Sequence, residues 1–203
     1  MCVSGERGAV KLPPFILASG SPRRRELLEQ LGARFRVETA QVEELECRQF
    51  TPRELCRANA FRKAQVVAMR HPAELVIGAD TLVHLGNETL GKPASLAEAR
   101  RMLKRLSGRT HEVTTACCLA RWRLPRRVVF EETTLVRFAV LKDAQIRRYL
   151  SAIDPLDKAG AYAIQQHGEW IVEALEGSFT NVVGLPLERL LRELTAWQDR
   201  EMV

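Results

Sequence analysis

A run of five small or apolar residues at positions 75–79 constrains the fold more than any other part of the chain. The sequence there is Leu-Val-Ile-Gly-Ala, with no polar residue to face solvent. A strand that is apolar on both faces is covered on both faces, as the central strands of α/β sheets are. The run leads into Asp80, and open α/β sheets bind ligands beyond the carboxyl ends of their strands. The sequence therefore predicts a buried central strand that ends at Asp80 beside a binding site.

Extended and helical patterns alternate on both sides of this run. Extended patterns predict strands at residues 15–18, 35–37, 75–79, 112–120 and 128–140, the last two as an antiparallel pair, and residues 82–85 continue extended after Asp80. Capping signals and apolar periodicity predict helices at residues 22–31, 51–69, 95–107, 143–153 and 186–197. No element is predicted between 154 and 184. This order predicts a mixed α/β sheet with flanking helices.

The length of 203 residues is enough for one large domain or for two closely joined lobes. No stretch approaches the roughly 20 apolar residues of a membrane-spanning helix. Residues 1–11 lack the apolar core of a signal peptide, so we expect a loose N-terminal tail. We therefore expect a cytoplasmic protein that does not associate with membranes.

Cysteine and histidine spacing argues against a structural zinc site. The five cysteines form no CxxC pair, and the four histidines form no HxxxH pair. The formal net charge of +6 favours an anionic partner, which is either a nucleic acid or a phosphorylated small molecule. Aromatic residues make up only 6% and do not alternate with basic ones, so a nucleic-acid partner is the weaker of the two.

Three consecutive arginines follow a Ser-Gly-Ser-Pro turn at the start of the first predicted helix. Arg23, Arg24 and Arg25 lie at the positive end of the helix dipole, where cations are unfavourable. A helix N-terminus after a strand and a tight turn already binds anions. The arrangement, which includes Ser21 as the expected N-cap, is thus typical of a phosphate site. The alternative is that the arginines extend into solvent.

Acidic and basic residues on other segments fit the same chemistry. Asp80 follows the central run, and Glu43 and Glu44 follow a predicted strand, so their carboxylates are candidates for a Mg²⁺ or Mn²⁺ site. Lys63 lies on an otherwise apolar helix face and either extends to solvent or points into a cleft. As alternatives, Asp80 caps a turn, or the carboxylates do not meet.

Two further segments contribute polar groups. Residues 86–93 nearly match a phosphate-binding loop, but Pro93 replaces the required hydroxyl residue and no helix follows, so a P-loop is rejected. Lys92 remains a candidate phosphate ligand. Gln165 lies in an irregular segment, and its amide suits the edge of a nucleobase. A solvent-exposed hairpin is the alternative for that segment.

Together these segments resemble the Maf family of nucleoside triphosphate pyrophosphatases over residues 15–195. The matching stretches are LASGSPRR at 17–24, VEE at 42–44, KA at 63–64, IGADT at 77–81, LGKP at 90–93, LSGRTH at 106–111, PLDKAGAY at 155–162 and VVGLP at 182–186. The resemblance implies one domain over 1–203, with an elongated mixed sheet like that of inosine triphosphatases and two lobes around a cleft. It also implies a homodimer.

The resemblance implies hydrolysis of a nucleoside triphosphate between its α and β phosphates, with a divalent cation (Mg²⁺, Mn²⁺ or Co²⁺). Asp80 matches the proton acceptor, and whether it acts as a base or as a metal ligand is left open. The residues that match positions for metal or phosphate are Glu43, Lys63 and Lys92, with Ser21, Arg23 and Arg24 in the phosphate turn. Glu43 and Asp80 are the expected metal ligands.

The family also contains subgroups with different substrates. Members that act on dTTP and UTP carry an arginine, a threonine and a glutamine at the places of Arg23, Thr81 and Gln165, and all three are present here. The resemblance thus predicts a dTTP/UTP pyrophosphatase. The rival hypothesis is a protein without catalysis that binds nucleic acid or regulates cell division, because the family is also named for inhibition of septum formation and residues 121–127 are strongly basic.

Overall fold

A seven-stranded mixed sheet forms the centre of the computed structural model, which describes residues 12–47, 49–124 and 126–200. The strand order is β2-β1-β3-β5-β6-β7, and β4 pairs with β3. The strands are β1 (Phe15–Leu17), β2 (Phe35–Val37), β3 (Leu75–Leu85), β4 (Glu88–Leu90), β5 (Thr110–Arg121), β6 (Arg126–Phe138) and β7 (Val172–Glu176). The tail expected at residues 1–11 lies outside the described residues.

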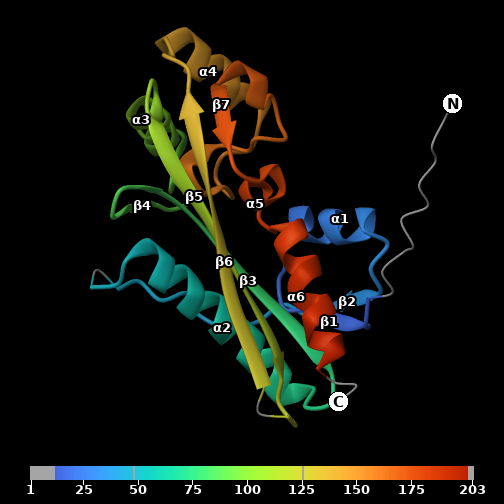
Figure 1. Cartoon of the computed structure of the whole chain (residues 1–203). Coiled ribbons are helices and arrows are strands. Elements are labelled where there is room, and N and C mark those ends of the chain that lie inside the picture. Colours follow the sequence, from blue (N-terminus) through green and yellow to red (C-terminus); the bar gives the residue numbers. More distant parts are fainter. Residues whose placement is uncertain (1–11, 48, 125, 201–203) are drawn as a thin grey trace, which may run out of the picture.

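Parallel and antiparallel pairing meet at β3. Its first residues pair in parallel with β1, and the strand pairs with β5 in antiparallel fashion from Val76 to His84. The long hairpin of β5 and β6 extends the sheet along the molecule (Figure 1). The mixed sheet and the antiparallel pair expected from the sequence are therefore confirmed.

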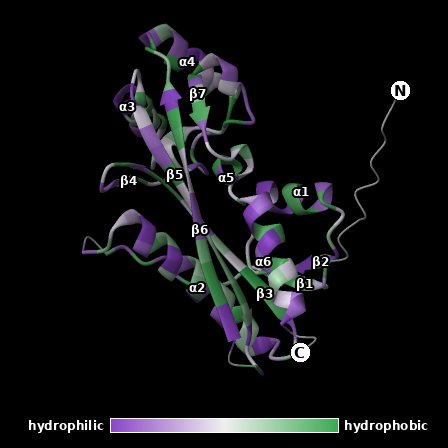
Figure 2. Ribbon diagram, viewed as in Figure 1, coloured by the Kyte–Doolittle hydropathy of each residue, from purple (hydrophilic) through white to green (hydrophobic). Residues whose placement is uncertain are grey.

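The helices cover both faces of the sheet. They are α1 (Pro22–Gln30), α2 (Pro52–Arg70), α3 (Leu96–Leu106), α4 (Asp143–Ala152), α5 (Phe179–Val183) and α6 (Leu187–Asp199), with 3-10 turns η1 (Ala159–Ala161) and η2 (Gly168–Trp170). In Figure 1, α2 lies on one side of the sheet, α1 and α6 lie on the other, and α3 and α4 lie at the far end of the β5–β6 hairpin. Both hydrophobic and hydrophilic residues occur along these helices (Figure 2). No helix in the described ranges is long and apolar enough to cross a bilayer.

Alternation along the central strands divides the core between the two faces. Ile77 and Cys117 pack with α1 and α6, whereas Val76 and Cys118 pack with α2. All four side chains are fully buried. The apolar run at residues 75–79 is thus covered on both faces, as predicted. A third apolar cluster joins α3 and α4 to the far ends of β5 and β6.

Gly78 allows α2 to lie directly against β3. A Cβ atom at this position would lie 2.4 Å from the carbonyl oxygen of Ala60 and 2.5 Å from the backbone nitrogen of Ala64, both in α2. Contacts this close are repulsive, so only glycine permits this separation between helix and strand. Lys63 lies between these two alanines in α2, and Asp80 lies two residues beyond Gly78 in β3, so the contact sets their separation.

The segment after α4 contains a strand and an α-helix that were not predicted, besides the short turns η1 and η2. The strand β7 and the short helix α5 lie in the stretch 154–184, which was expected to be irregular. Each has only five residues, and β7 is held by pairing with β6 rather than by its own pattern. Ser21 occupies the expected N-cap position of α1, but its side chain makes no capping hydrogen bond.

A buried aromatic cluster anchors the loop that precedes η2. His111 Nε2 and the Tyr162 hydroxyl are 2.8 Å apart, and both rings pack edge-to-face against Phe138. Two residues with positive φ, Gly160 (70°) and Ala161 (63°), turn the chain into this cluster. Burial, together with repulsion from His84, lowers the pKa of His111 to about 4. The neutral imidazole thus belongs to the folded state.

Replacing Gly78 with alanine should destabilise the fold by about 1–3 kcal/mol, because α2 must move away from β3 to admit the methyl group. Urea denaturation measures this change. Gly91→Ala is the matched control, since a Cβ atom there meets nothing within 4 Å. Equal midpoints for wild type and Gly78→Ala would contradict the packing argument.

His111 should make the protein acid-sensitive. Its folded pKa of about 4 lies below the ordinary value of about 6.5, so the unfolded chain binds the extra proton between these values. The contribution of neutral His111 to the free energy of unfolding is therefore fully present above about pH 6.5, and it declines as the pH falls to about 4. Between pH 6.5 and 4, the free energy of unfolding should fall by about 3 kcal/mol less in His111→Gln than in the wild type. The exposed His167→Gln variant, measured by the same urea titrations, should retain the wild-type slope.

Candidate active site

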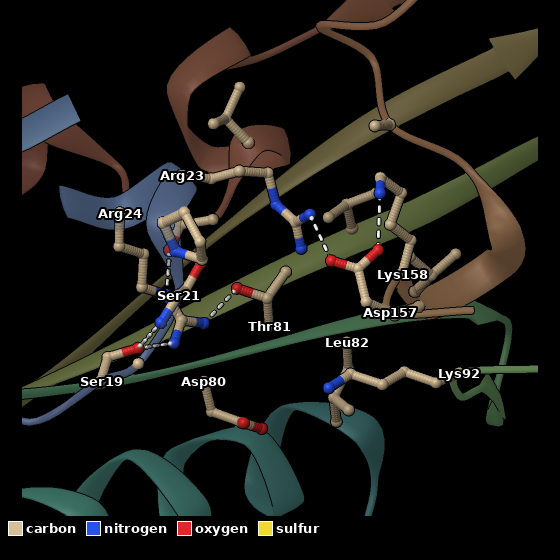
Figure 3. Close-up of a pocket in the computed structure, with 18 of the residues that line it drawn as sticks. Ser19, Ser21, Arg23, Arg24, Asp80, Thr81, Leu82, Lys92, Asp157 and Lys158 are labelled. Carbon is tan, nitrogen blue, oxygen red and sulfur yellow. Dashed lines mark hydrogen bonds and ion pairs between the residues drawn. The ribbon is translucent and has the colours of Figure 1, made fainter. Parts of the chain in front are cut away.

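A cavity of about 770 Å³ opens where β1 stops and β3 continues. β1 ends at Leu17, and the chain then turns through residues 18–21 into α1. The longer β3 runs on as the floor of the space beyond this turn, and the loop at residues 157–165 forms the opposite wall. Figure 3 shows side chains from these segments pointing into the same space.

Asp80 lies in the floor of the cavity and is 3% exposed. It does not follow the end of a strand, as was expected, but lies in the middle of β3, paired with Ala116 of β5. The expectation was wrong because pairing with β5 continues the strand to Leu85. The cavity nevertheless forms at the carboxyl end of the parallel strand β1.

Lys63 connects Asp80 to a second carboxylate. Its Nζ atom lies 2.7 Å from Asp80 Oδ1 and 2.6 Å from Glu44 Oε1. The lysine side chain is 13% exposed and lines the cavity, so it points into the cleft rather than to solvent. Asp80 Oδ2 is buried and accepts no hydrogen bond from any described residue. One oxygen of Asp80 is thus neutralised by Lys63, and the other is free to accept a proton or a cation.

Of the acidic pair at residues 43–44, Glu43 was the expected metal ligand, but Glu44 is the residue that lies in the cavity. Both glutamates are exposed, but Glu44 lines the cavity and contacts Lys63, whereas Glu43 does not line the cavity. Burial alone would raise the pKa of Glu44, but the hydrogen bond and charge of Lys63 lower it overall, with smaller contributions from Lys92 and Arg24. Glu44 is therefore anionic at neutral pH.

The carboxylates suit a hard divalent cation. The described residues contain no group of three or more Asp, Glu, His or Cys side chains that would enclose a metal by itself. Mg²⁺ commonly takes only one or two carboxylates and completes its shell with water and substrate phosphates. Asp80 Oδ2 lacks a donor, and Glu44 is close to the same lysine, so the residues present fit such an ion.

Arg24 is buried and hydrogen-bonded to four protein groups. Its Nε donates to the Gly184 carbonyl, Nη1 donates to Ser19 Oγ and the Ala79 carbonyl, and Nη2 donates to Thr81 Oγ1, at 2.8–3.0 Å. Four of its five N–H groups are thus used inside the protein. Arg24 joins three segments around the cavity.

Thr81 continues this network into the next strand. Thr115 donates its hydroxyl proton to the Asn181 carbonyl, so the 2.9 Å contact between Thr81 and Thr115 requires Thr81 to be the donor. Thr81 also accepts from Arg24. Its hydroxyl proton is therefore unavailable to a ligand. Thr81 lines the cavity but acts chiefly by holding Arg24.

The remaining predicted residues lie along the cavity wall. Ser21, Arg23, Lys92 and Gln165 all line the cavity. Lys92 follows β4, and the next helix starts only at Leu96, which agrees with the rejection of a P-loop. Gln165 is exposed, and its amide has no hydrogen-bond partner among the described residues. It also lines an adjoining cavity of about 320 Å³. Arg25 lies outside both cavities and pairs with Glu29.

Two charged residues of the site were given no role from the sequence. Asp157 and Lys158 line both cavities, and Lys158 is only 6% exposed. Both belong to the PLDKAGAY stretch, where charge among small residues in an irregular segment was the available signal.

Known proteins resemble this chain over most of its length. The sequence model of the family described as "Maf-like protein" matches residues 14–197. A dTTP/UTP pyrophosphatase of Akkermansia muciniphila is 46% identical over 182 residues, which cover 89% of this chain and 95% of that protein. One of Symbiobacterium thermophilum is 47% identical over 180 residues, covering 89% and 92%.

A solved structure supports the fold independently. The Staphylococcus aureus Ham1 protein superposes with a TM-score of 0.53 at 15% identity, covering 91% of this chain and 99% of that one. At this identity the likeness bears on the fold alone, and it agrees with the elongated mixed sheet. The family match extends across both walls of the cavity, from β1 to α6. The chain belongs to the Maf-like protein family.

Proposed function

We propose that this protein is a nucleoside triphosphate pyrophosphatase that hydrolyses dTTP and UTP to the monophosphate and pyrophosphate. Its relatives at 46–47% identity bear the name of this activity. The observation that carries the proposal is Asp80, whose Oδ2 atom is buried and without a partner in the floor of a cavity lined by cations. Such a carboxylate suits proton abstraction beside a polyanionic substrate.

The reaction transfers the α-phosphorus from the bridging oxygen of pyrophosphate to a water molecule. The Pα–O bond to the β-phosphate breaks, a new Pα–O bond forms, and the water loses a proton. Negative charge increases on the leaving pyrophosphate. A site for this reaction therefore needs an acceptor for one proton and cations near the phosphate oxygens.

The residues of the cavity supply both. Asp80 Oδ2 is the free acceptor, because Lys63 already occupies Oδ1. Lys63, Lys92 and Arg23 offset phosphate charge, and the N-terminus of α1 after Ser21 adds the partial positive charge of its dipole. Arg24 holds the phosphate turn against β3 and Gly184. Arg24 and the Lys63–Asp80 pair are already held by hydrogen bonds before the substrate arrives, which lowers the cost of reorganisation.

A divalent cation is part of the proposal. The carboxylates of Asp80 and Glu44 would hold Mg²⁺ or Mn²⁺, whose positive charge would offset the negative charge that develops at the α-phosphate. Co²⁺ offers similar chemistry. Glu43, the other expected ligand, is exposed beside this site. We further propose a cytoplasmic homodimer, for which light scattering of the purified protein is the test.

A nucleic-acid-binding protein without catalysis remains the alternative, favoured by the exposed Trp122 within the basic segment 121–127. Binding of that kind weakens steeply with rising salt. Titration of labelled duplex DNA and RNA at two salt concentrations, beside a turnover assay with dTTP, separates the two functions. Turnover without binding supports the enzyme, and salt-sensitive binding without turnover supports the alternative.

The products distinguish this reaction from other phosphatase activities. With dTTP and Mg²⁺ or Mn²⁺, the purified protein should release dTMP and pyrophosphate in equal amounts. Chromatography of the nucleotides and a pyrophosphate assay measure both. Formation of dTDP and orthophosphate would mean that the γ-phosphate is attacked instead. Removal of divalent cations by EDTA should abolish turnover, and Mg²⁺ should restore it.

Asp80→Asn should reduce turnover by about 10²- to 10⁴-fold, because the amide retains the shape but can neither take the proton nor hold a cation. Circular dichroism should show a retained fold. Asp143→Asn is the control, since this carboxylate pairs with Arg100 and Lys104 on the surface of the molecule. Wild-type turnover in a folded Asp80→Asn protein would exclude Asp80 as base or ligand.

Base selectivity should depend on Gln165. Its exposed amide is able to donate to a pyrimidine carbonyl and accept from the ring N3–H, so dTTP and UTP should have higher kcat/KM than CTP, GTP and ATP. Gln165→Glu should reduce the preference in kcat/KM for dTTP and UTP over the other nucleotides, because an ionised carboxylate cannot donate a hydrogen bond. Gln166→Glu adds the same charge but lines only the smaller cavity, so its preference should equal that of the wild type. Equal kcat/KM values for all five nucleotides would refute the selectivity.

A further inference from the structure

Asp157 joins two cations of the candidate active site. One carboxylate oxygen lies 3.5 Å from Arg23 Nη1, and the other lies 2.6 Å from Lys158 Nζ. Arg23 belongs to α1, whereas Asp157 and Lys158 belong to the loop across the cavity. Figure 3 shows the three charged groups in a chain along the upper side of the site, with Asp80 on the opposite side of Thr81.

The carboxylate of Asp157 is ionised and faces the space that phosphates would enter. Burial alone would raise its pKa, but the hydrogen bond and charge of Lys158 lower it, with further contributions from Arg23 and Lys92. Its side chain is 54% exposed and lines the cavity. A negative charge at this position competes with substrate for Arg23 and repels any bound anion.

Asp157 is not needed to hold either cation in place. Lys158 also donates to the backbone carbonyl of Asp154, and its side chain is almost fully buried. The contact with Arg23 is a single one at 3.5 Å between partly exposed groups, without bidentate geometry. Such a pair contributes little to stability. The position of Asp157 is therefore better explained by its effect on anions than by support of the fold.

We propose that Asp157 is a counter-charge that limits the affinity of the site for pyrophosphate, so that this product leaves. The proposal rests on the proposed function. Pyrophosphate carries the same phosphate groups that Arg23, Lys63 and Lys92 hold in the triphosphate, so a site with uncompensated cations would retain it. Release of product limits turnover in many enzymes. Asp157 thus speeds the release of pyrophosphate, and the same negative charge also weakens the binding of the triphosphate substrate.

Calorimetric titration with inorganic pyrophosphate, without divalent cation, tests the proposal on wild type and Asp157→Asn. The variant should bind pyrophosphate about five- to tenfold more tightly, as expected for removal of one like charge a few ångströms away. Glu29→Gln is the matched control, because Glu29 pairs with Arg25 of the same helix at 3.6 Å but does not line the cavity. It should bind as the wild type does.

Kinetics give a second readout. In Asp157→Asn, KM for dTTP and the inhibition constant of pyrophosphate should both fall severalfold, with kcat lowered or unchanged. A carboxylate that instead orients Arg23 for substrate would give the opposite sign, namely weaker pyrophosphate binding and a higher KM. Weaker or unchanged binding would overturn the proposal, as would pyrophosphate binding undetectable in all three proteins.

Two points keep this result separate from the proposed function. The titration requires no turnover, so a protein that failed to hydrolyse dTTP would refute the activity while the comparison of pyrophosphate affinities still stood. If Asp157→Asn does not fold, Asp157→Ser removes the same charge and should give the same gain in affinity.

Discussion

The contact between Lys63 and Asp80 depends on the absence of a side chain at Gly78. A helix normally packs on a sheet at a distance set by side chains on both, but here the backbone of α2 lies against the backbone of β3. Lys63 is thereby brought within 2.7 Å of a carboxylate in the floor of the cavity. With α2 further away, Asp80 would be a buried charge without a partner, which is costly. The packing of the core and the electrostatics of the site are thus set by the same residue.

Much of the architecture was readable because its signals are local. The apolar run at residues 75–79, the capping box at Thr51 and the periodicity of the helices each specify an element without reference to distant residues. The missed strand β7 depends on a distant partner. β7 exists because Val136 and its neighbours offer backbone groups to residues 174–176, and five residues carry too little pattern to indicate this. The position of Asp80 within β3 was missed for the same reason, since β5 extends the strand.

The candidate site was predictable as a set of residue types but not as a set of contacts. Asp80, Lys63, Arg23 and Lys92 all line one cavity, and the roles that the resemblance implied for them stay predictions. Sequence alone did not indicate that Glu44 rather than Glu43 contacts Lys63, because one residue's difference in a loop reverses the direction of a side chain. Nor did it indicate that the guanidinium of Arg24 would be satisfied by protein groups, since its acceptors come from three separate segments.

The hydrogen bond from Arg24 to Gly184 spans 160 residues of sequence. On the ribosome, Arg24 is synthesised early, but Gly184, whose carbonyl fixes the Arg24 guanidinium, is synthesised near the end of the chain. The same holds for the Thr115 hydroxyl, whose acceptor at Asn181 also lies late in the chain. Neither hydrogen bond can form before both of its partners have been synthesised. A growing or prematurely terminated chain therefore contains the turn at residues 18–21 without the hydrogen bond that fixes the guanidinium of Arg24.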